Sequence, residues 1–180
     1  MRHEIHVFSG LGSSLFPSLS YGTRTLEKLI DALPYAQADH HVWNEWPAVA
    51  ASIVERWKKT KEPFRTVLIG HSNGVIATNS VAAYLAARRI QTDYIGAIDP
   101  TAGSFPVIGR NVAETSEFWA GSGWPSMARR FSGGRRGALQ YVDAWPGIKR
   151  LYHIPGSHVA CASNKRVHDV ILGDLARVLG

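Results

Sequence analysis

The chain has 180 residues, a length that fits one domain with one substantial core. Hydrophobic residues make up 45% of it and charged residues 19%, which argues against a disordered chain or a coiled coil. The net charge is +6, and four of these charges come from one short stretch that contains Arg129, Arg130, Arg135 and Arg136. The basic charge is therefore local, and a nucleic-acid-binding surface is not expected.

The redox and targeting features are few. A single cysteine, Cys161, excludes an intramolecular disulfide and is expected to be a small buried residue. The first residues are predicted to form a strand and lack the apolar core of a signal peptide. No apolar run approaches the roughly 18 residues needed to cross a membrane. We therefore expect a soluble, cytoplasmic protein.

Short β-like runs alternate with amphipathic helical stretches along the chain. This alternation predicts a mainly parallel α/β sheet with helices on both faces, in a single domain over 1–180. The segment 120–138, rich in Gly, Ser and Arg, is expected to be an excursion loop. The six expected strands are 5–8, 39–43, 66–69, 94–98, 112–119 and 150–154. The expected helices are 23–33, 47–59, 74–88 and a closing helix that Ser163 caps.

The strand at 66–69 leads into the most informative motif of the chain. It is followed by Gly70-His71-Ser72-Asn73-Gly74, which fits the Gly-x-Ser-x-Gly pattern of a nucleophile elbow. A serine in such a turn needs small residues two positions before and after it, because the helix and the neighbouring strands approach closely. The next residue opens a helix, so its N–H points at developing negative charge. We predict Ser72 as a nucleophile; an incidental serine in a glycine-rich turn is the alternative.

With this motif between a buried strand and an apolar helix, the chain resembles the α/β-hydrolase superfamily, in its lipase and esterase branch. The resemblance spans almost the whole chain and implies a three-layer fold. The loop Ser9-Gly10-Leu11-Gly12-Ser13 is similar to the His-Gly-Leu-x-Gly oxyanion loop of many lipases, with Ser9 in place of the usual His. The resemblance implies an oxyanion hole made by the backbone N–H groups of Leu11 and Asn73. The alternative for this loop is a plain glycine-rich turn.

The acid of the expected catalytic triad has two main candidates. In most of the superfamily the acid follows the strand after next from the nucleophile, and Asp143 is the candidate for that later position. However, Ile98-Asp99-Pro100-Thr101-Ala102 follows the very next strand and resembles the Leu-Asp-Pro-Ala stretch of pancreatic-type lipases, where that Asp is the acid. We predict Asp99, for which a turn residue before proline is the alternative. Glu114, in mid-strand, is a poorer candidate.

The expected base is His158, which follows the last strand and precedes the closing helix, where the superfamily's catalytic histidine lies. The chain order Ser72, Asp99, His158 agrees with the order of this fold. A structural histidine in this loop is the alternative. The remaining histidines fit less well, because His71 is expected to point sideways and the others lie in strands, in a helix or near the start: His3, His6, His40, His41, His153 and His168.

The sequence contains no metal or cofactor pattern. It has no cysteine pair, no His-x-x-x-His on a predicted helix, and no dinucleotide or phosphate-loop motif after the first strand. In length the chain resembles minimal, lidless lipases and cutinase-like enzymes. The resemblance implies a serine hydrolase of carboxylic esters or thioesters, from small molecules or a surface, acting through an acyl-enzyme on Ser72. An amidase, an acyltransferase and a non-catalytic binding protein of the same fold are the alternatives.

Aromatic residues near the arginine cluster allow two interpretations. They form either an acyl-binding wall beside a basic rim that attracts an anionic surface or ligand, or core under a solvated loop. The residues concerned are Phe118, Trp119, Trp124, Phe131 and Trp145.

Overall fold

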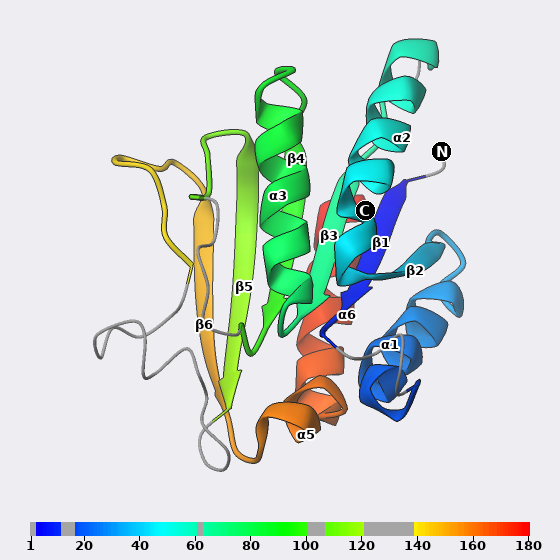
Figure 1. Cartoon of the computed structure of the whole chain (residues 1–180), viewed down its shortest axis with the longest axis vertical. Helices are drawn as coiled ribbons and strands as arrows, with labels where there is room; N and C mark the ends of the chain where they lie inside the picture. Colours follow the sequence, from blue (N-terminus) through cyan, green and yellow to red (C-terminus); the bar gives the residue numbers. More distant parts are fainter. Residues whose placement is uncertain (1–2, 12–16, 61–62, 101–106, 121–138) are drawn as a thin grey trace.

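The computed structural model describes residues 3–11, 17–60, 63–100, 107–120 and 139–180. Within them, six strands form one parallel sheet in the order β2-β1-β3-β4-β5-β6. Because all five pairings are parallel, the C-terminal ends of the strands share one edge of the sheet, toward which β5 runs downward in Figure 1. The predicted six-stranded α/β architecture is confirmed. The strands are β1 (Glu4–Ser9), β2 (Ala38–Val42), β3 (Thr66–His71), β4 (Thr92–Ile98), β5 (Val112–Ala120) and β6 (Ile148–Ile154).

Helices cover both faces of the sheet, as expected. On one face lie α1 (Tyr21–Asp31) and α6 (Lys165–Leu179), and on the other lie α2 (Trp46–Lys59) and α3 (Gly74–Ala86) (Figure 1). Short 3₁₀ turns, Pro17–Ser20 and Trp43–Glu45, precede α1 and α2. A short helix, α5 (His158–Ala162), follows β6 at the edge where the strands end.

Two hydrophobic clusters, one on each face, form the core. Strand side chains alternate between them: Val7 belongs to the same cluster as Ile171 of α6, whereas its neighbour Phe8 belongs to the same cluster as Val81 of α3. This is the period of two that a strand imposes. The central strands β3 and β4 are buried along their whole length, since helices cover both of their faces. The continuous apolar run of β3 follows from this double burial.

The C-terminal helices begin at other residues than expected. His158, expected in a loop, is the first residue of α5, and the hydroxyl of Ser157 caps this helix. Ser163, expected to cap the closing helix, lies instead at the end of α5, and Asn164 caps α6. Serine and asparagine are both good N-caps. The pattern therefore located the start of the closing helix without distinguishing between two adjacent caps.

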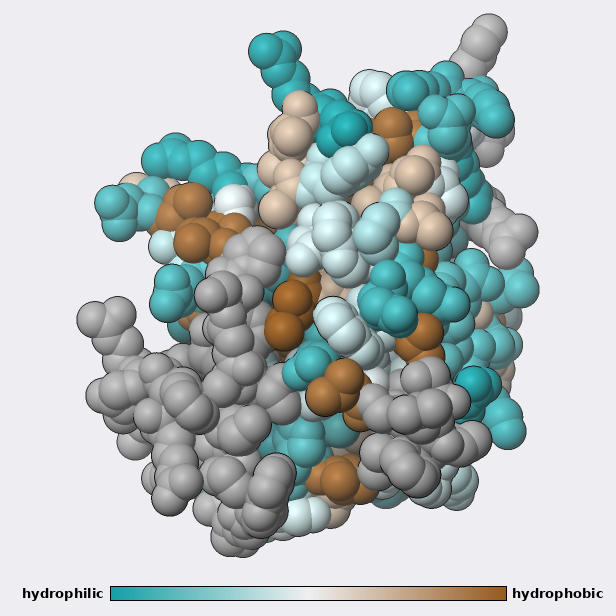
Figure 2. Space-filling model, in the orientation of Figure 1, coloured by the Kyte–Doolittle hydropathy of each residue, from teal (hydrophilic) through white to brown (hydrophobic). Residues whose placement is uncertain are grey.

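Several expectations lie outside the described residues. They include residues 121–138 of the excursion loop, and with them Arg129, Arg130, Arg135 and Arg136. Within the described part of the chain, none of the helices combines the length and the apolar character that a membrane span requires. On the face shown in Figure 2, the coloured hydrophobic residues lie in small groups separated by hydrophilic ones.

The space around two glycines predicts opposite effects of alanine substitution on stability, because α3 packs closely on β1 at one of them and the other is open. A Cβ on Gly74 would lie 2.3 Å from the carbonyl oxygen of Phe8, whereas a Cβ on Gly173, exposed in α6, would meet nothing within 4 Å. We expect Gly74→Ala to lower the free energy of unfolding by about 1–3 kcal/mol, as overpacking does. Gly173→Ala should raise it by about 0.5–1 kcal/mol, because glycine is unfavourable inside a helix. Urea denaturation of both variants checks this, and a Gly74→Ala protein of wild-type stability would contradict it.

Candidate active site

Ser72 occupies a sharp turn between β3 and α3. Its φ is +59°, in the left-handed region that residues other than glycine seldom adopt. The Ser72 N–H donates to the carbonyl oxygen of Ile98 at 3.0 Å, which ties the turn to the end of β4. Such backbone strain persists only where the surrounding structure enforces it, and it is concentrated at functional sites.

Glycines allow three chain segments to meet at this turn. A Cβ on Gly70 would lie 2.4 Å from the backbone of Gly74, so the strand end and the helix start are in direct backbone contact. Gly10, in the loop after β1, lies against the serine, since its Cβ would come 2.7 Å from Ser72 Cβ. These close approaches explain why small residues are needed two positions before and after the serine.

Leu11 and Asn73 lie beside the serine on two different segments. Asn73 directly follows Ser72 at the N-terminus of α3, where backbone N–H groups point out of the helix. Leu11 follows Gly10 and lines the same cavity as Ser72. Both residues expected to supply the oxyanion donors therefore lie next to Ser72 or line its cavity. The rest of the expected oxyanion loop, Gly12 and Ser13, lies outside the described residues.

Asp99, directly after β4, is fully buried and holds His158. Its Oδ2 lies 2.7 Å from His158 Nδ1, and its Oδ1 accepts the backbone N–H of Ala120 at 3.0 Å. A buried carboxylate is costly unless it is hydrogen-bonded, and here both oxygens have a partner. Because carboxylate oxygens only accept, Nδ1 of His158 carries the proton and Nε2 is left to accept another.

Ser72 and His158 line one cavity of about 380 Å³. The exposed side chains of Leu11 and Val159 give it apolar walls. Among the described residues, no hydrogen bond joins Ser72 Oγ to the His158 ring. Such contacts are often long in free enzymes and shorten in the substrate complex. The other described lining residues are Gly10, His71 and Ser157.

His71, which sequence reasoning did not assign to the site, faces His158. The two rings stack, with centroids 4.7 Å apart and an interplanar angle of 29°. His71 Nε2 lies 3.1 Å from the backbone carbonyl oxygen of His158. Within the described residues, His71 Nδ1 is buried without a hydrogen-bond partner. The pattern Gly-x-Ser-x-Gly leaves this position open, and the partner lies 87 residues away, so no local signal marks the contact.

Burial determines the charge of His71. Desolvation, and secondarily the nearby His158, lower the pKa of His71 to about 4. A carbonyl oxygen only accepts, so Nε2 carries the proton of the neutral ring. Protonation would place a second N–H on the unpartnered Nδ1 and a positive charge in the core. His71 is therefore neutral at ordinary pH.

The other two candidate acids, Asp143 and Glu114, lie away from His158. Asp143 is exposed in a turn, where Arg110 donates to its backbone carbonyl at 3.4 Å. Arg110 precedes β5 whereas His158 follows β6, so Asp143 lies toward the opposite edge of the parallel sheet. Glu114 is paired with Arg150 at 2.8 Å. Of the three candidate acids, the structure brings only Asp99 to the histidine; Thr101 and Ala102 of its motif lie outside the described residues.

The aromatic residues fall into two groups. Phe118 is fully buried in the core, which contradicts an acyl-binding role for that side chain, and Trp119 packs on His153 with ring centroids 4.2 Å apart. Trp124 and Phe131 lie outside the described residues. Cys161 is buried as expected, and burial raises the pKa of its thiol well above the ordinary value.

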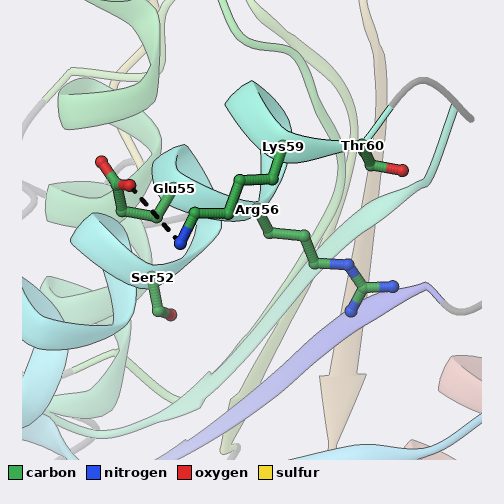
Figure 3. Close-up of a pocket in the computed structure, with 5 residues that line it drawn as sticks. All are labelled: Ser52, Glu55, Arg56, Lys59 and Thr60. Carbon is green, nitrogen blue, oxygen red and sulfur yellow. Dashed lines mark ion pairs between the residues drawn. The ribbon is translucent and has the colours of Figure 1, made fainter.

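A second cavity, of about 490 Å³, lies along the C-terminal half of α2 (Figure 3). Lys59 and Glu55 form a 3.9 Å ion pair across its lining, and Ser52 donates its hydroxyl proton to a carbonyl of its own helix. No histidine is among its described lining residues, so it offers no base for a hydroxyl. The cavity at Ser72 is the candidate active site.

Comparison with known proteins supports the fold. No family model matches the chain, and no curated protein matches it. Among solved structures, the RedJ thioesterase of the prodiginine pathway in Streptomyces coelicolor has a TM-score of 0.60 and 13% identity, over 98% of this chain and 90% of its own. The NocB thioesterase domain, solved as a covalent complex with a fluorophosphonate nocardicin G analog, has a TM-score of 0.58 and 15% identity, over 98% and 95%. The surfactin thioesterase domain SrfTE has a TM-score of 0.56 and 11% identity, over 96% and 92%.

These matches run across nearly the full chain, and all three are to thioesterases. The six-stranded parallel sheet with helices packed on both faces has the same architecture as these structures. The chain has the α/β-hydrolase fold.

The buried neutral His71 predicts a pH-dependent stability. The pKa of His71 is about 4 in the folded protein and near 6.5 in the unfolded chain, so the unfolded chain binds more protons between these values. The stabilisation is complete above pH 6.5 and is lost as the pH falls toward 4. Burial also lowers the pKa of His40 to about 4, so His40 adds to the dependence of the unfolding free energy on pH.

In His71→Phe we expect the slope of the unfolding free energy against pH to fall by up to about 1.4 kcal/mol per pH unit. This is the slope that one titrating proton contributes. Urea titrations between about pH 4.5 and 6.5 measure this slope. Equal slopes for wild type and variant would contradict the burial of a neutral His71.

Proposed function

We propose that this protein is a serine hydrolase that cleaves carboxylic esters or thioesters. The observation that carries the proposal is one cavity lined by Ser72, on a strained turn, and by His158, whose ring is hydrogen-bonded to the buried Asp99. A nucleophile, a base and a group that orients the base are the three parts that acyl transfer through a serine requires.

In the first half-reaction, Ser72 Oγ attacks the carbonyl carbon and its proton passes to His158 Nε2. The carbonyl oxygen becomes an oxyanion, which the backbone N–H groups of Leu11 and Asn73 stabilise; one such donor is typically worth roughly 3 kcal/mol. When the tetrahedral intermediate collapses, the carbon–oxygen or carbon–sulfur bond breaks. His158 gives its proton to the departing alcohol or thiol, and the acyl group stays on Ser72.

In the second half-reaction, water attacks the acyl-enzyme while His158 takes one of its protons. Collapse of the second intermediate releases the carboxylic acid, and the proton returns from His158 to Ser72 Oγ. Asp99 stays ionised throughout; it fixes the Nδ1–H tautomer and stabilises the transient imidazolium. The apolar walls at Leu11 and Val159 suit an apolar acyl or alcohol group.

Thioesters are included in the proposal because the three solved structures described above are thioesterases. At this level of identity the likeness supports the fold alone, so kinetic measurements must decide between an alcohol and a thiol leaving group. Rates on esters and thioesters that carry the same acyl chain separate the two classes, and a series of chain lengths measures the fit of the apolar walls.

A fluorophosphonate probe tests the proposed nucleophile. We expect one covalent label per wild-type chain, because an activated serine attacks phosphorus and expels fluoride, and we expect no label on Ser72→Ala. Ser52→Ala, in the second cavity, is the matched control and should label at the wild-type rate. Intact-protein mass spectrometry measures the label. An unlabelled wild-type protein would overturn the proposal in favour of the non-catalytic alternative.

The assignment of the acid predicts a difference between two aspartates. Asp99→Asn keeps the size of the side chain but changes the tautomer of His158, so kcat should fall by about 10⁴, the order expected when a triad carboxylate is neutralised. Asp143→Asn, at the exposed turn, should leave kcat within about twofold. Steady-state hydrolysis measures both. A large loss in Asp143→Asn together with an active Asp99→Asn would reverse the assignment.

A further inference from the structure

His71 contacts the proposed base at two points. Its Nε2–H donates to the backbone carbonyl of His158 at 3.1 Å, and its ring lies on the His158 ring with centroids 4.7 Å apart. His71 is also the residue immediately before Ser72. One buried side chain therefore connects the turn that carries the nucleophile to the first turn of α5, which carries the base.

The second contact supplies an orientation that Asp99 alone does not fix. The hydrogen bond from Nδ1 to Asp99 Oδ2 holds one edge of the His158 ring but leaves rotation about the line of that bond. Such rotation swings Nε2 away from Ser72 Oγ. A flat ring stacked on the imidazole opposes the rotation, since tilting His158 would press it into His71.

We propose that His71 is a positioning residue, which holds the ring and backbone of His158 so that Nε2 faces Ser72. This rests on the proposed function and names a further residue of the same site. The role requires a neutral His71, and the ionisable groups that face it are His158 from α5 and Asp99 from the end of β4. Burial lowers the pKa of His71 and keeps it uncharged beside the base.

Three substitutions separate the two contacts. His71→Phe keeps a stacked ring and loses the N–H donor, His71→Gln keeps a donor and loses the ring, and His71→Ala loses both. We expect the second-order rate of fluorophosphonate labelling to fall about tenfold or more in His71→Ala. His71→Phe should retain more activity than His71→Gln, because the ring contact sets the orientation. KM should change little while kcat falls.

His168 provides a matched control for stability. It is a second buried histidine, and its Nε2 lies 2.7 Å from the carbonyl oxygen of Ala162, in the same helix α5. It differs from His71 in lying outside the described lining of the cavity. His168→Ala should lower the melting temperature as His71→Ala does, yet label within about threefold of the wild-type rate. Equal slowing in both alanine variants, or wild-type labelling in His71→Ala, would overturn the proposal.

A spectroscopic measurement that requires no catalysis or labelling separates this inference from the proposed function. In imidazole ¹⁵N spectra of the wild-type protein, we expect His71 as the neutral Nε2–H tautomer from pH 8 down to about 5, and a protected His158 Nδ1–H resonance. This resonance should broaden in His71→Ala and persist in His168→Ala. A His71 that titrates near its ordinary pKa, or a His158 resonance unchanged in His71→Ala, would overturn the inference even where labelling succeeds. An unlabelled wild type with the expected spectra would overturn only the proposed function.

Discussion

The structure of the site depends on one steric constraint: three backbone segments pass each other at Ser72 too closely for side chains between them. The end of β3, the start of α3 and the loop after β1 meet there, and a Cβ on Gly70 or Gly10 would lie within 2.7 Å of atoms already in place. This contact forces Ser72 to a φ of +59°. It also sets the positions of Leu11 and Asn73, because each directly follows a residue in the crossing.

The register of the sheet extends this constraint to the acid. His71 pairs with Ile98, and Ile98 with Phe118, so β3, β4 and β5 are aligned where they approach the site. Asp99 is the next residue after β4, and the backbone N–H of Ala120 at the end of β5 donates a hydrogen bond to its Oδ1. The cost of burying the carboxylate is offset by neighbours that the register supplies, which leaves Oδ2 for His158.

Much of this was predictable because it is local in the sequence. Apolar runs indicated the strands, and the glycine spacing around Ser72 indicated the turn, in which Gly70 contacts Gly74 four positions further on. The contacts of Gly74 with Phe8 and of Gly10 with Ser72 join distant segments and needed the fold. The motif at Asp99 indicated the acid, although its distance to His158 needed the fold. The role of His71 was not predictable, because it arises where two segments 87 residues apart meet. The cap of α6 was misplaced by one residue because Ser163 and Asn164 carry the same local signal.

The unpartnered Nδ1 of His71 has an electrostatic consequence. In the proposed reaction, the positive charge that His158 gains with a proton is balanced by Asp99 at 2.7 Å. A second positive charge on His71, 4.7 Å from the His158 ring, would oppose that protonation by about 3.5 kcal/mol at an effective dielectric constant of about 20. Burial prevents this by lowering the pKa of His71, and among the described residues no acceptor near Nδ1 offers the hydrogen bond that a charged His71 would need. A polar atom without a partner costs stability in most cores. At this position the unpartnered Nδ1, together with burial, keeps His71 neutral, so a protonated His158 faces only the compensating charge of Asp99.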